Sequence, residues 1–540
     1  MTNIFIFNNA SLAAGYGIGT YVRQLSDGLS AIPDTKVSLV EMYADTREFA
    51  ISDDDNGTRH YLIPPLQSNM ESETYCRIIF YFLARNIDLA ENDKLVFQFN
   101  YFQHYPLAVL LKAWYINCSI VLTVHYMSWC FELKGNVGKM RKIIAEGYEP
   151  LEDAERRVLF SFANEKAFLH LADAVLVLSK STMGVLVSDY KVSPAKIHLV
   201  YNGIANDVCD RVALAGKDMR HILFVGRIND DKGLKFIIDA FAQIADKHPD
   251  TNLVIVGDGD FQPFMAQGRK ILGRIAFLGK MQRDEIENVY QSAYIGIMPS
   301  FHEQCSYTVI EMMRHGIPVI GTDAIGLSEM LDATPELQVH IDGDNFNEED
   351  FESQIASRMD LLLSDDAAYR LASDTVRKEY EERYTLDAMT LGVQDAVLSL
   401  QANPSSIVSP DYFPHIDNQM AALIDRHPDI DADFFGIAGI GIYLWWRVLQ
   451  LEKDAVANAE QLAMIKEHLI YYLDWLEEVM NNEPLWDGLC LMLTNMKELG
   501  FCPVLAERIL GHGKIDSNDN SFPSEQEIIN NALKICTCKI

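Results

Sequence analysis

Short apolar runs alternate with longer stretches of helical periodicity along the first 385 residues. The runs lie at 3–7, 37–41, 95–99, 119–124, 174–178 and 197–200, and then at 221–225, 252–256, 275–278, 294–298 and 317–320. Such runs, separated by helices, are typical of buried parallel strands joined by crossover connections. The pattern therefore predicts an α/β fold with two doubly wound, Rossmann-like domains, at residues 1–200 and 201–385.

The pattern changes near residue 401. Residues 403–414 are rich in proline and serine, which predicts a linker over 401–415. Beyond it the helical period continues without strand runs, so we expect an all-helical accessory domain at 416–540. From residue 401 onward the chain carries nine Lys and Arg against twenty-one Asp and Glu. This part therefore contributes strongly to the acidity of the chain.

Composition narrows the possible partners. The 540 residues are 49% hydrophobic and carry a formal net charge of -32. Nucleic acid is not expected as a partner, because its phosphates are bound through a surplus of Lys and Arg. No apolar run reaches bilayer-spanning length, and MTNIFIFNN is typical of a buried strand rather than a secretion signal. We expect a cytoplasmic protein with no integral membrane segment; its nine irregularly spaced cysteines predict free thiols.

Two glutamates separated by seven residues are the first candidates for chemistry. If Glu303 and Glu311 lay on one helix, their backbones would be about 12 Å apart. Glycosidase carboxylates lie closer, at about 5 to 9.5 Å. We therefore predict that Glu303 lies in a loop near a sugar, whereas Glu311 lies on a helix and accepts hydrogen bonds from ribose hydroxyls. A solvated helix face is the alternative interpretation.

A second cluster follows the apolar run 221–225. The run ends at Gly226 and Arg227, and a helix resumes after Lys232. A glycine at such a strand end lets backbone amides approach a phosphate, and the two cations favour a departing diphosphate. Because these cations already neutralise the diphosphate, we predict activity without a metal ion or other cofactor. Ordinary surface charge beside a turn is the alternative.

These residues belong to an ordered set of motifs. In chain order the set reads AAGYGIGTYVRQL, VLTVHYM, VLVLSKST, LVYNGI, FVGR with a following KG, IVGDGD, FLGKM, IGIMPS and the Glu-x7-Glu segment. The set resembles the retaining glycosyltransferases of family four, which have the GT-B fold, over most of residues 1–400. The resemblance implies retaining transfer of a hexose-type sugar from a nucleoside-diphosphate sugar. The acidic chain favours a soluble acceptor, with a peptide as one candidate.

The resemblance also implies roles for single residues. Arg227 and Lys232 would hold the donor diphosphate, and Glu311 would hold the ribose. Glu303 and His125 would lie beside the donor sugar. In this family a late helix crosses back to the first domain, and residues 386–400 are expected to form it.

One loop departs from the family pattern. After Glu303 the family usually has a glycine-containing stretch, whereas this chain has Gln304, Cys305, Ser306 and Tyr307. We expect donor contacts from Gly17, Gly226, Cys305, Ser306 and Tyr307, with glycines allowing close backbone approach. Ser306 is also expected to cap the helix that follows, whose positive end would face the phosphates.

Two other readings stay open for the two main domains. Residues 15–20, GYGIGT, partly match a dinucleotide fingerprint, with Glu41 as its ribose carboxylate, which would indicate an NAD-dependent oxidoreductase. A non-catalytic scaffold that binds nucleotide sugar is the second.

The role of the helical tail is equally open. Residues 436–449 resemble one helix pair of lanthionine-cyclase-like barrels. The tail is expected to serve acceptor recognition, oligomerisation or a plain structural role.

Overall fold

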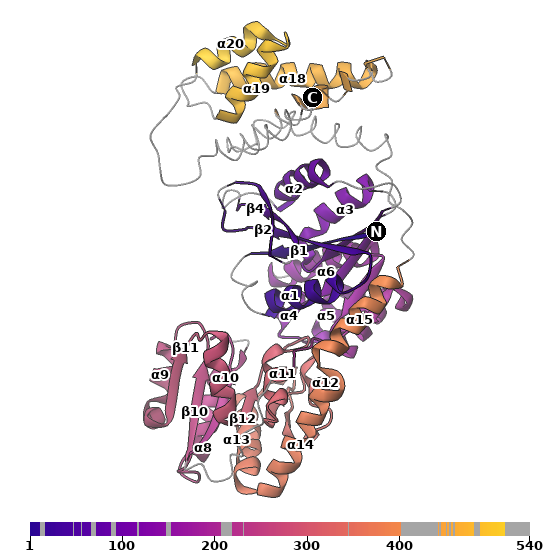
Figure 1. The fold of residues 1–540 in the computed structure, drawn as a ribbon. Coiled ribbons are helices and arrows are strands. Elements are labelled where there is room, and N and C mark those ends of the chain that lie inside the picture. The colour runs from indigo at the N-terminus through magenta and orange to yellow at the C-terminus, as the bar shows by residue number, and fades with distance from the viewer. Residues whose placement is uncertain are drawn as a thin grey trace.

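Two parallel α/β domains and a group of carboxy-terminal helices make up the protein (Figure 1). The computed structural model describes residues 1–10, 17–46, 48–55, 57–65, 72–87, 93–115, 118–146, 153–206, 219–229, 232–343, 345–400, 441, 444–445, 447–449, 451–452, 455–456, 459–479 and 487–512. The predicted fold class is confirmed. The predicted linker at 401–415, most of residues 436–449 and the loop that precedes Gly17 lie outside the described residues.

The first domain is built on an eight-stranded sheet of order β3-β4-β2-β1-β5-β6-β7-β8. Its strands are β1 (Thr2–Asn9), β2 (Thr35–Met42), β3 (Ala50–Asp53), β4 (Arg59–Ile63), β5 (Lys94–Phe99), β6 (Ser119–Val124), β7 (Ala174–Val177) and β8 (Ile197–Leu199). All pairs are parallel except β3 with β4. The apolar pattern misses this edge hairpin because each of its strands has at most three consecutive apolar residues, and Arg59 pairs with Asp53 across it at 2.9 Å.

Helices cover both faces of this sheet. They are α1 (Gly17–Ser30), α2 (Ser72–Asn86), α3 (Tyr105–Trp114), α4 (Trp129–Leu133), α5 (Val137–Glu146), α6 (Asp153–Leu171) and α7 (Lys180–Ser188). Side chains of β1 alternate between the faces, as a strand requires. Ile4 and Ile6 pack in one core with Tyr21 and Leu25 of α1, whereas Phe7 packs in another with residues of α2, α3 and α6.

The second domain has a six-stranded, wholly parallel sheet of order β11-β10-β9-β12-β13-β14. Its strands are β9 (Arg220–Val225), β10 (Thr251–Val256), β11 (Ile275–Gly279), β12 (Ala293–Met298), β13 (Val319–Thr322) and β14 (Gln338–Val339). Its helices are α8 (Leu234–Ile244), α9 (Gln262–Gln267), α10 (Arg283–Ser292), α11 (Tyr307–Arg314), α12 (Leu327–Met330), α13 (Glu348–Ser364) and α14 (Asp366–Arg383). Strands β9 and β12 are neighbours, so the loops at their carboxyl ends lie side by side.

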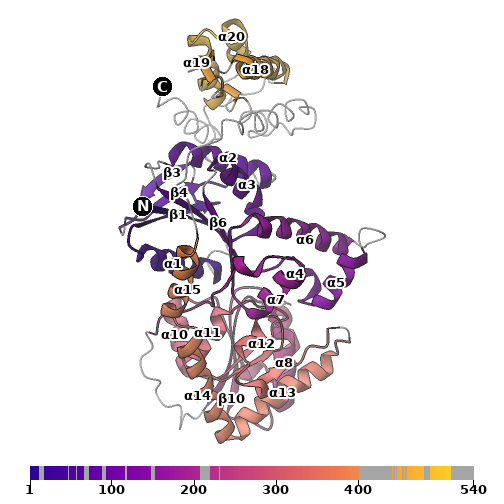
Figure 2. The same cartoon turned by 90° about the vertical axis from the view of Figure 1, so that its right-hand side faces the viewer.

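The chain crosses between the domains twice, and the two crossings run side by side. The first follows β8, and the second leads from α14 to α15 (Leu386–Leu398), which packs on α1 of the first domain (Figure 2). The amide of Ile204 donates to the carbonyl of Tyr384 at 3.1 Å, and the amide of Leu386 donates to that of Ile204 at 2.8 Å. These paired segments form the hinge.

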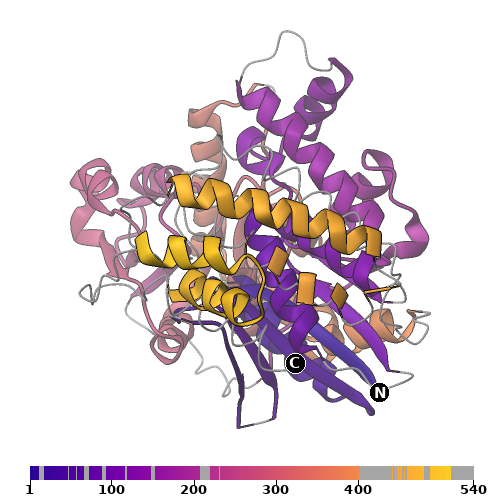
Figure 3. The same cartoon turned by 90° about the horizontal axis from the view of Figure 1, so that it is seen from above.

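The described carboxy-terminal part is helical. Helices α18 (Ala459–Val479), α19 (Asp487–Glu498) and α20 (Pro503–His512) pack together through buried residues such as Leu469, Leu493 and Ala506 (Figure 3). Within the described residues, every helix is too short or too polar to cross a bilayer.

The hinge generates the first prediction. A Cβ on Gly203 would lie 2.2 Å from the carbonyl oxygen of Thr385, so Gly203→Ala must push the crossings apart. We expect a loss of about 2 kcal/mol of stability, measured as a lower melting temperature. Gly184→Ala on α7 is the control, because its Cβ meets nothing within 4 Å and alanine favours a helix. Equal melting temperatures for the two variants would contradict this account of the hinge.

Candidate active site

The loops after β9 and β12 bring Lys232 and Glu303 together. Helix α8 can begin close to β12 because Gly233 adopts φ +69°, and a Cβ there would lie 2.6 Å from the carbonyl oxygen of Pro299. Only glycine accepts both the left-handed backbone and this approach. The glycine thus places Lys232, one residue earlier, against the loop that follows β12.

Lys232 and Glu303 form a hydrogen-bonded ion pair. Their side chains are 19% and 14% exposed, so water screens the pair only partly. Burial alone would raise the pKa of Glu303, but the attraction and hydrogen bond of Lys232 outweigh burial and lower that pKa below its usual value. Glu303 is therefore an ionised hydrogen-bond acceptor at neutral pH.

Arg227 and Gly226 lie at the end of β9. In the described part of the chain Arg227 has no ion-pair partner, and its side chain is exposed. The amide of Gly226 donates to the carbonyl of Val256 at 3.0 Å, so this amide is already engaged. Arg227 therefore supplies positive charge at this strand end. The close approach at this point is to Gly257, where a Cβ would lie 1.7 Å from the carbonyl oxygen of Gly226.

Glu311 lies on α11, four residues into the helix. Its Oε2 accepts a hydrogen bond from the hydroxyl of Tyr290 at 2.6 Å. Burial, followed by the charge and hydrogen bond of Glu311, raises the pKa of Tyr290, so the phenol remains a donor. The tyrosine fixes the orientation of the carboxylate.

The loop between the two glutamates is largely buried. Burial raises the pKa of the Cys305 thiol to about 12, which keeps it protonated, and the Cys305 carbonyl accepts from Asn202 Nδ2 at 2.7 Å. Ser306 lies at the amino end of α11, but its side chain makes no capping hydrogen bond, so that prediction is wrong. The Ser306 amide instead faces Met330 Sδ at 3.3 Å. The first turn of α11 therefore keeps amides that no side chain caps.

His125 follows β6 at the carboxyl edge of the first sheet. Its Nε2 lies 3.0 Å from Asn100 Oδ1, and Asn100 Nδ2 donates to the carbonyl of Phe7, so the ring donates through Nε2. The Tyr21 ring packs edge-on against the imidazole, and the two ring centroids are 4.6 Å apart. Burial lowers the pKa of His125 to about 3. His125 is neutral at physiological pH, with Nδ1 left as an acceptor.

Helix α1 of the first domain contacts the start of α11 in the second domain. The hydroxyl of Tyr307 donates to Gln24 Oε1 on α1 at 2.8 Å. A Cβ on Gly17 would lie 3.7 Å from the Tyr307 ring, so the start of α1 lies against the start of α11. On the other side of the cleft, Lys134 Nζ lies 5.1 Å from the centroid of the Phe301 ring. The structure thus brings Gly17 and Tyr307 together.

Several residues that complete the site were not predicted. Asn100 orients His125, Tyr290 orients Glu311, and Gln24 anchors Tyr307. Asn100 carried a signal, because a polar residue directly after the apolar run 95–99 marks a strand end that faces a ligand cleft. Tyr290 and Gln24 lie on amphipathic helices, where nothing in the local pattern separates them from ordinary core or surface positions.

Two protein-family models match the chain. Residues 16–208 match the model described as Glycosyltransferase Family 4, and residues 219–365 match the one described as Glycosyl transferases group 1. Both models describe glycosyltransferases, which agrees with the predicted transferase and not with the alternative of an NAD-dependent oxidoreductase. Neither reaches the carboxy-terminal helices, so the lanthionine-cyclase resemblance stays a prediction.

Curated relatives share the transferase description. A glycosyltransferase of Methanocaldococcus jannaschii is 28% identical over 39% of this chain and 56% of its own length. The 2-deoxystreptamine glucosyltransferase of Streptomyces kanamyceticus is 28% identical over 35% of this chain and 53% of its own. The D-inositol 3-phosphate glycosyltransferase of Mycobacteroides abscessus is 30% identical over 34% and 43%. The chain spans about half the length of these relatives.

Solved structures share the fold. Sucrose-phosphate synthase from Thermosynechococcus elongatus superposes with a TM-score of 0.57 at 20% identity, over 74% of this chain and 98% of its own. An Anabaena protein solved in complex with UDP-glucose gives a TM-score of 0.51 at 14% identity, over 74% and 100%. At these identities the likeness concerns the fold alone.

The neutral state of His125 generates the second prediction. The pKa of His125 is about 3 in the folded protein and has its ordinary value of 6.5 in the unfolded chain. Between these two pH values the imidazole therefore takes up a proton when the protein unfolds. The contribution of His125 to the free energy of unfolding is fully present above the ordinary pKa and is lost as the pH falls. The loss is about 1.4 kcal/mol at about pH 5.5. His125→Gln should lose less stability than the parent between about pH 8 and 5.5 in calorimetric melts. Equal losses would contradict a buried neutral imidazole.

Proposed function

We propose that this chain, whose two α/β domains match glycosyltransferase family models and have the GT-B fold, moves a hexose-type sugar from a nucleoside-diphosphate donor to a soluble acceptor. The observation that carries the proposal is the pairing of Lys232 with Glu303 beside the uncapped start of α11. The pair supplies a cation and a carboxylate, and the start of α11, four residues after Glu303, supplies amides that no side chain caps.

The departing diphosphate is the group that this point suits. Negative charge grows on the leaving phosphate as the bond to the sugar breaks. Lys232 and the exposed Arg227 supply fixed positive charge, and the amino end of α11 adds amide donors and the positive end of the helix dipole. Because these groups neutralise the diphosphate, we propose that transfer needs no metal ion and no other cofactor.

The donor sugar and ribose are assigned to the three remaining groups. Glu303, ionised beside Lys232, accepts hydrogen bonds from hydroxyls of the donor sugar. His125, which lies in the opposite domain, accepts a further hydrogen bond from the sugar through its Nδ1. Glu311, oriented by Tyr290, accepts from the ribose hydroxyls. Closure of the two domains over the donor would exclude water, which competes with the acceptor.

Retention follows from the proposed path. The acceptor oxygen attacks the anomeric carbon on the face from which the diphosphate leaves, and the leaving phosphate oxygen takes the acceptor proton. Bond formation and proton transfer thus occur on the same side of the sugar. The support for retention is the family to which the two domains belong.

The acceptor is proposed to be soluble and polar, and a peptide is one candidate. The net charge of -32 disfavours docking on anionic lipid, so we place the protein in the cytoplasm. Two relatives are named for small polar acceptors, 2-deoxystreptamine and D-inositol 3-phosphate. The carboxy-terminal helices are assigned to acceptor recognition or oligomerisation.

A nucleotide-sugar-binding scaffold is the second candidate function, and the Gln304 side chain is the observation in its favour. Gln304 stands where the family usually has a glycine, and it is buried against Thr182 of the first domain. Its bulk occupies a loop through which family members approach the donor. A scaffold would bind the donor without releasing diphosphate.

A donor panel tests these alternatives and gives the third prediction. UDP, GDP, ADP and dTDP, each with its glucose form, are screened by thermal shift, because a ligand at 100 times its Kd adds about 2.7 kcal/mol of stability. We expect one base to stabilise the chain and its sugar form to release nucleoside diphosphate, with the same rate in excess chelator. Stabilisation without any release would favour the scaffold, and a strict magnesium requirement would contradict the proposed charge neutralisation.

A further inference from the structure

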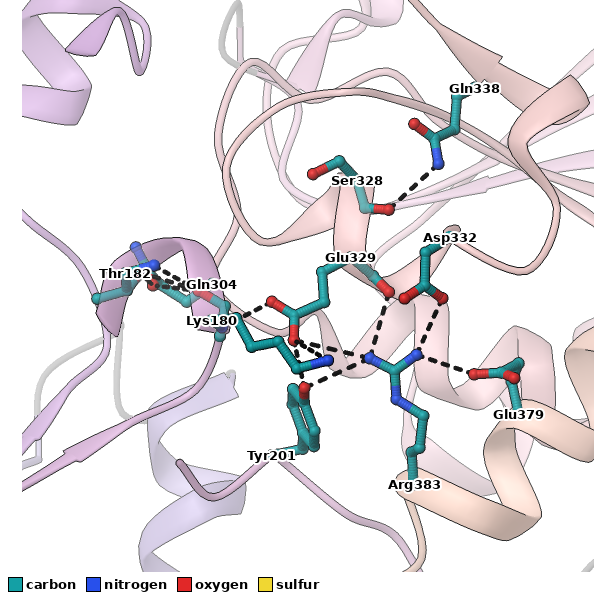
Figure 4. Close-up of polar contacts among 11 residues, drawn as sticks. Lys180, Thr182, Tyr201, Gln304, Ser328, Glu329, Asp332, Gln338, Glu379 and Arg383 are labelled. Atoms are coloured by element: carbon teal, nitrogen blue, oxygen red, sulfur yellow. Dashed lines mark hydrogen bonds and ion pairs between the residues drawn. The ribbon is translucent and has the colours of Figure 1, made fainter. Parts of the chain in front are cut away.

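A buried carboxylate outside the donor site joins the two domains. Glu329 lies on α12 of the second domain and is 8% exposed. Its Oε2 accepts a hydrogen bond from the backbone amide of Lys180 at 2.6 Å (Figure 4). Lys180 is the first residue of α7 in the first domain, so the carboxylate of one domain lies at the positive amino end of a helix of the other.

The same carboxylate contacts both chain crossings. Tyr201, on the first crossing, donates its hydroxyl to Glu329 Oε1. Arg383, at the start of the second crossing, lies 3.7 Å from Oε1 and donates to the Glu329 carbonyl at 3.3 Å (Figure 4). The guanidinium also stacks over the Tyr201 ring, 5.0 Å from its centroid. Glu329 therefore ties α7 to the two segments about which the domains turn.

The amino end of α7 also holds the loop that carries Glu303. Thr182 donates its hydroxyl to Gln304 Oε1, and Ser179 Oγ lies 3.5 Å from the same oxygen. Gln304 is 6% exposed and follows Glu303 directly. On the far side of this loop, a Cβ on Gly326 would lie 2.3 Å from the Glu303 carbonyl oxygen, so the start of α12 packs against it.

We propose that Glu329 is a positioning residue that sets the closed angle between the domains and, through α7 and Gln304, holds Glu303 in place for transfer. The catalytic part of this inference rests on the proposed function, whereas the structural part does not. Glu329 makes no hydrogen bond or ion pair with Lys232 or Glu303, and acts through α7.

The coupling has a physical cause. If the domains rotated about the two crossings, the Lys180 amide would move away from Glu329. Tyr201 and Arg383 would keep their contacts with Glu329. A buried carboxylate that loses a donor is unfavourable, so the bond to α7 favours the closed angle. The same rotation separates Thr182 from Gln304, and the loop of Glu303 then loses its support in the first domain. Domain angle and carboxylate position change together.

Hydrogen exchange of the free full-length chain tests the structural part. Glu329→Gln keeps the shape but removes the charge, and Tyr201→Phe removes only one donor. We expect amides of α7 and of residues 301–306 to exchange about tenfold faster in Glu329→Gln, and less so in Tyr201→Phe. The control is Asp332→Asn, which loses its ion pair with Arg383 at 3.0 Å but contacts no residue of α7. Parent-like exchange in Glu329→Gln, or equal acceleration in the control, would overturn the inference.

Turnover of UDP-glucose supplies the second readout. Glu329→Gln should lower kcat with KM for UDP-glucose unchanged, because the donor contacts remain and only their alignment is lost. A raised KM with unchanged kcat would contradict a positioning role. If another donor of the panel is turned over instead, it replaces UDP-glucose in this assay. If the parent turns over none of them, the proposed function is at fault, and the exchange data still decide whether Glu329 sets the domain angle.

Discussion

The ion pair of Lys232 with Glu303 is the interaction on which the cleft depends. It joins the amino end of α8 to the loop after β12 and keeps Glu303 ionised despite burial. A lone charge in this position would lose much of its solvation without compensation, whereas the pair holds both charges at the strand ends. In the proposed function, the donor site is therefore built from groups that satisfy each other before a ligand arrives, and a phosphate would need only to share Lys232.

Backbone geometry makes that pairing possible. Gly233 lets α8 start against Pro299, and Gly326 lets α12 start against Glu303. Both positions have positive φ and no room for a Cβ, so the polypeptide itself, rather than a side-chain network, fixes the two partners. The paired crossings at Ile204 and Tyr384 then fix where the first domain, with His125, meets this framework. Electrostatics at the site and packing at the hinge are thus parts of one arrangement.

The sequence predicts much of this and misses the rest for identifiable reasons. Apolar periodicity predicts both sheets, because buried parallel strands are continuous apolar runs, but it misses the edge hairpin of β3 and β4, whose apolar runs are short. The strand-end motifs predict that Glu303 lies in a loop and Glu311 on a helix. Partners such as Tyr290 for Glu311 leave no local pattern, whereas Asn100, the partner of His125, is marked only by its place after an apolar run. The proposed cap by Ser306 failed because tertiary packing, not local propensity, decides where that residue points.

The charge at the two strand ends is the central claim, and one variant tests it most directly. Replacing Arg227 and Lys232 together by methionine removes both cations while keeping much of their aliphatic bulk. Release of nucleoside diphosphate from the donor identified in the panel should fall at least about 1000-fold, since two charge-assisted contacts to the leaving group are lost. The melting temperature should fall, because Glu303 loses its partner, so circular dichroism checks that the variant remains folded at the assay temperature. Parent-like turnover in a folded double variant would contradict the account.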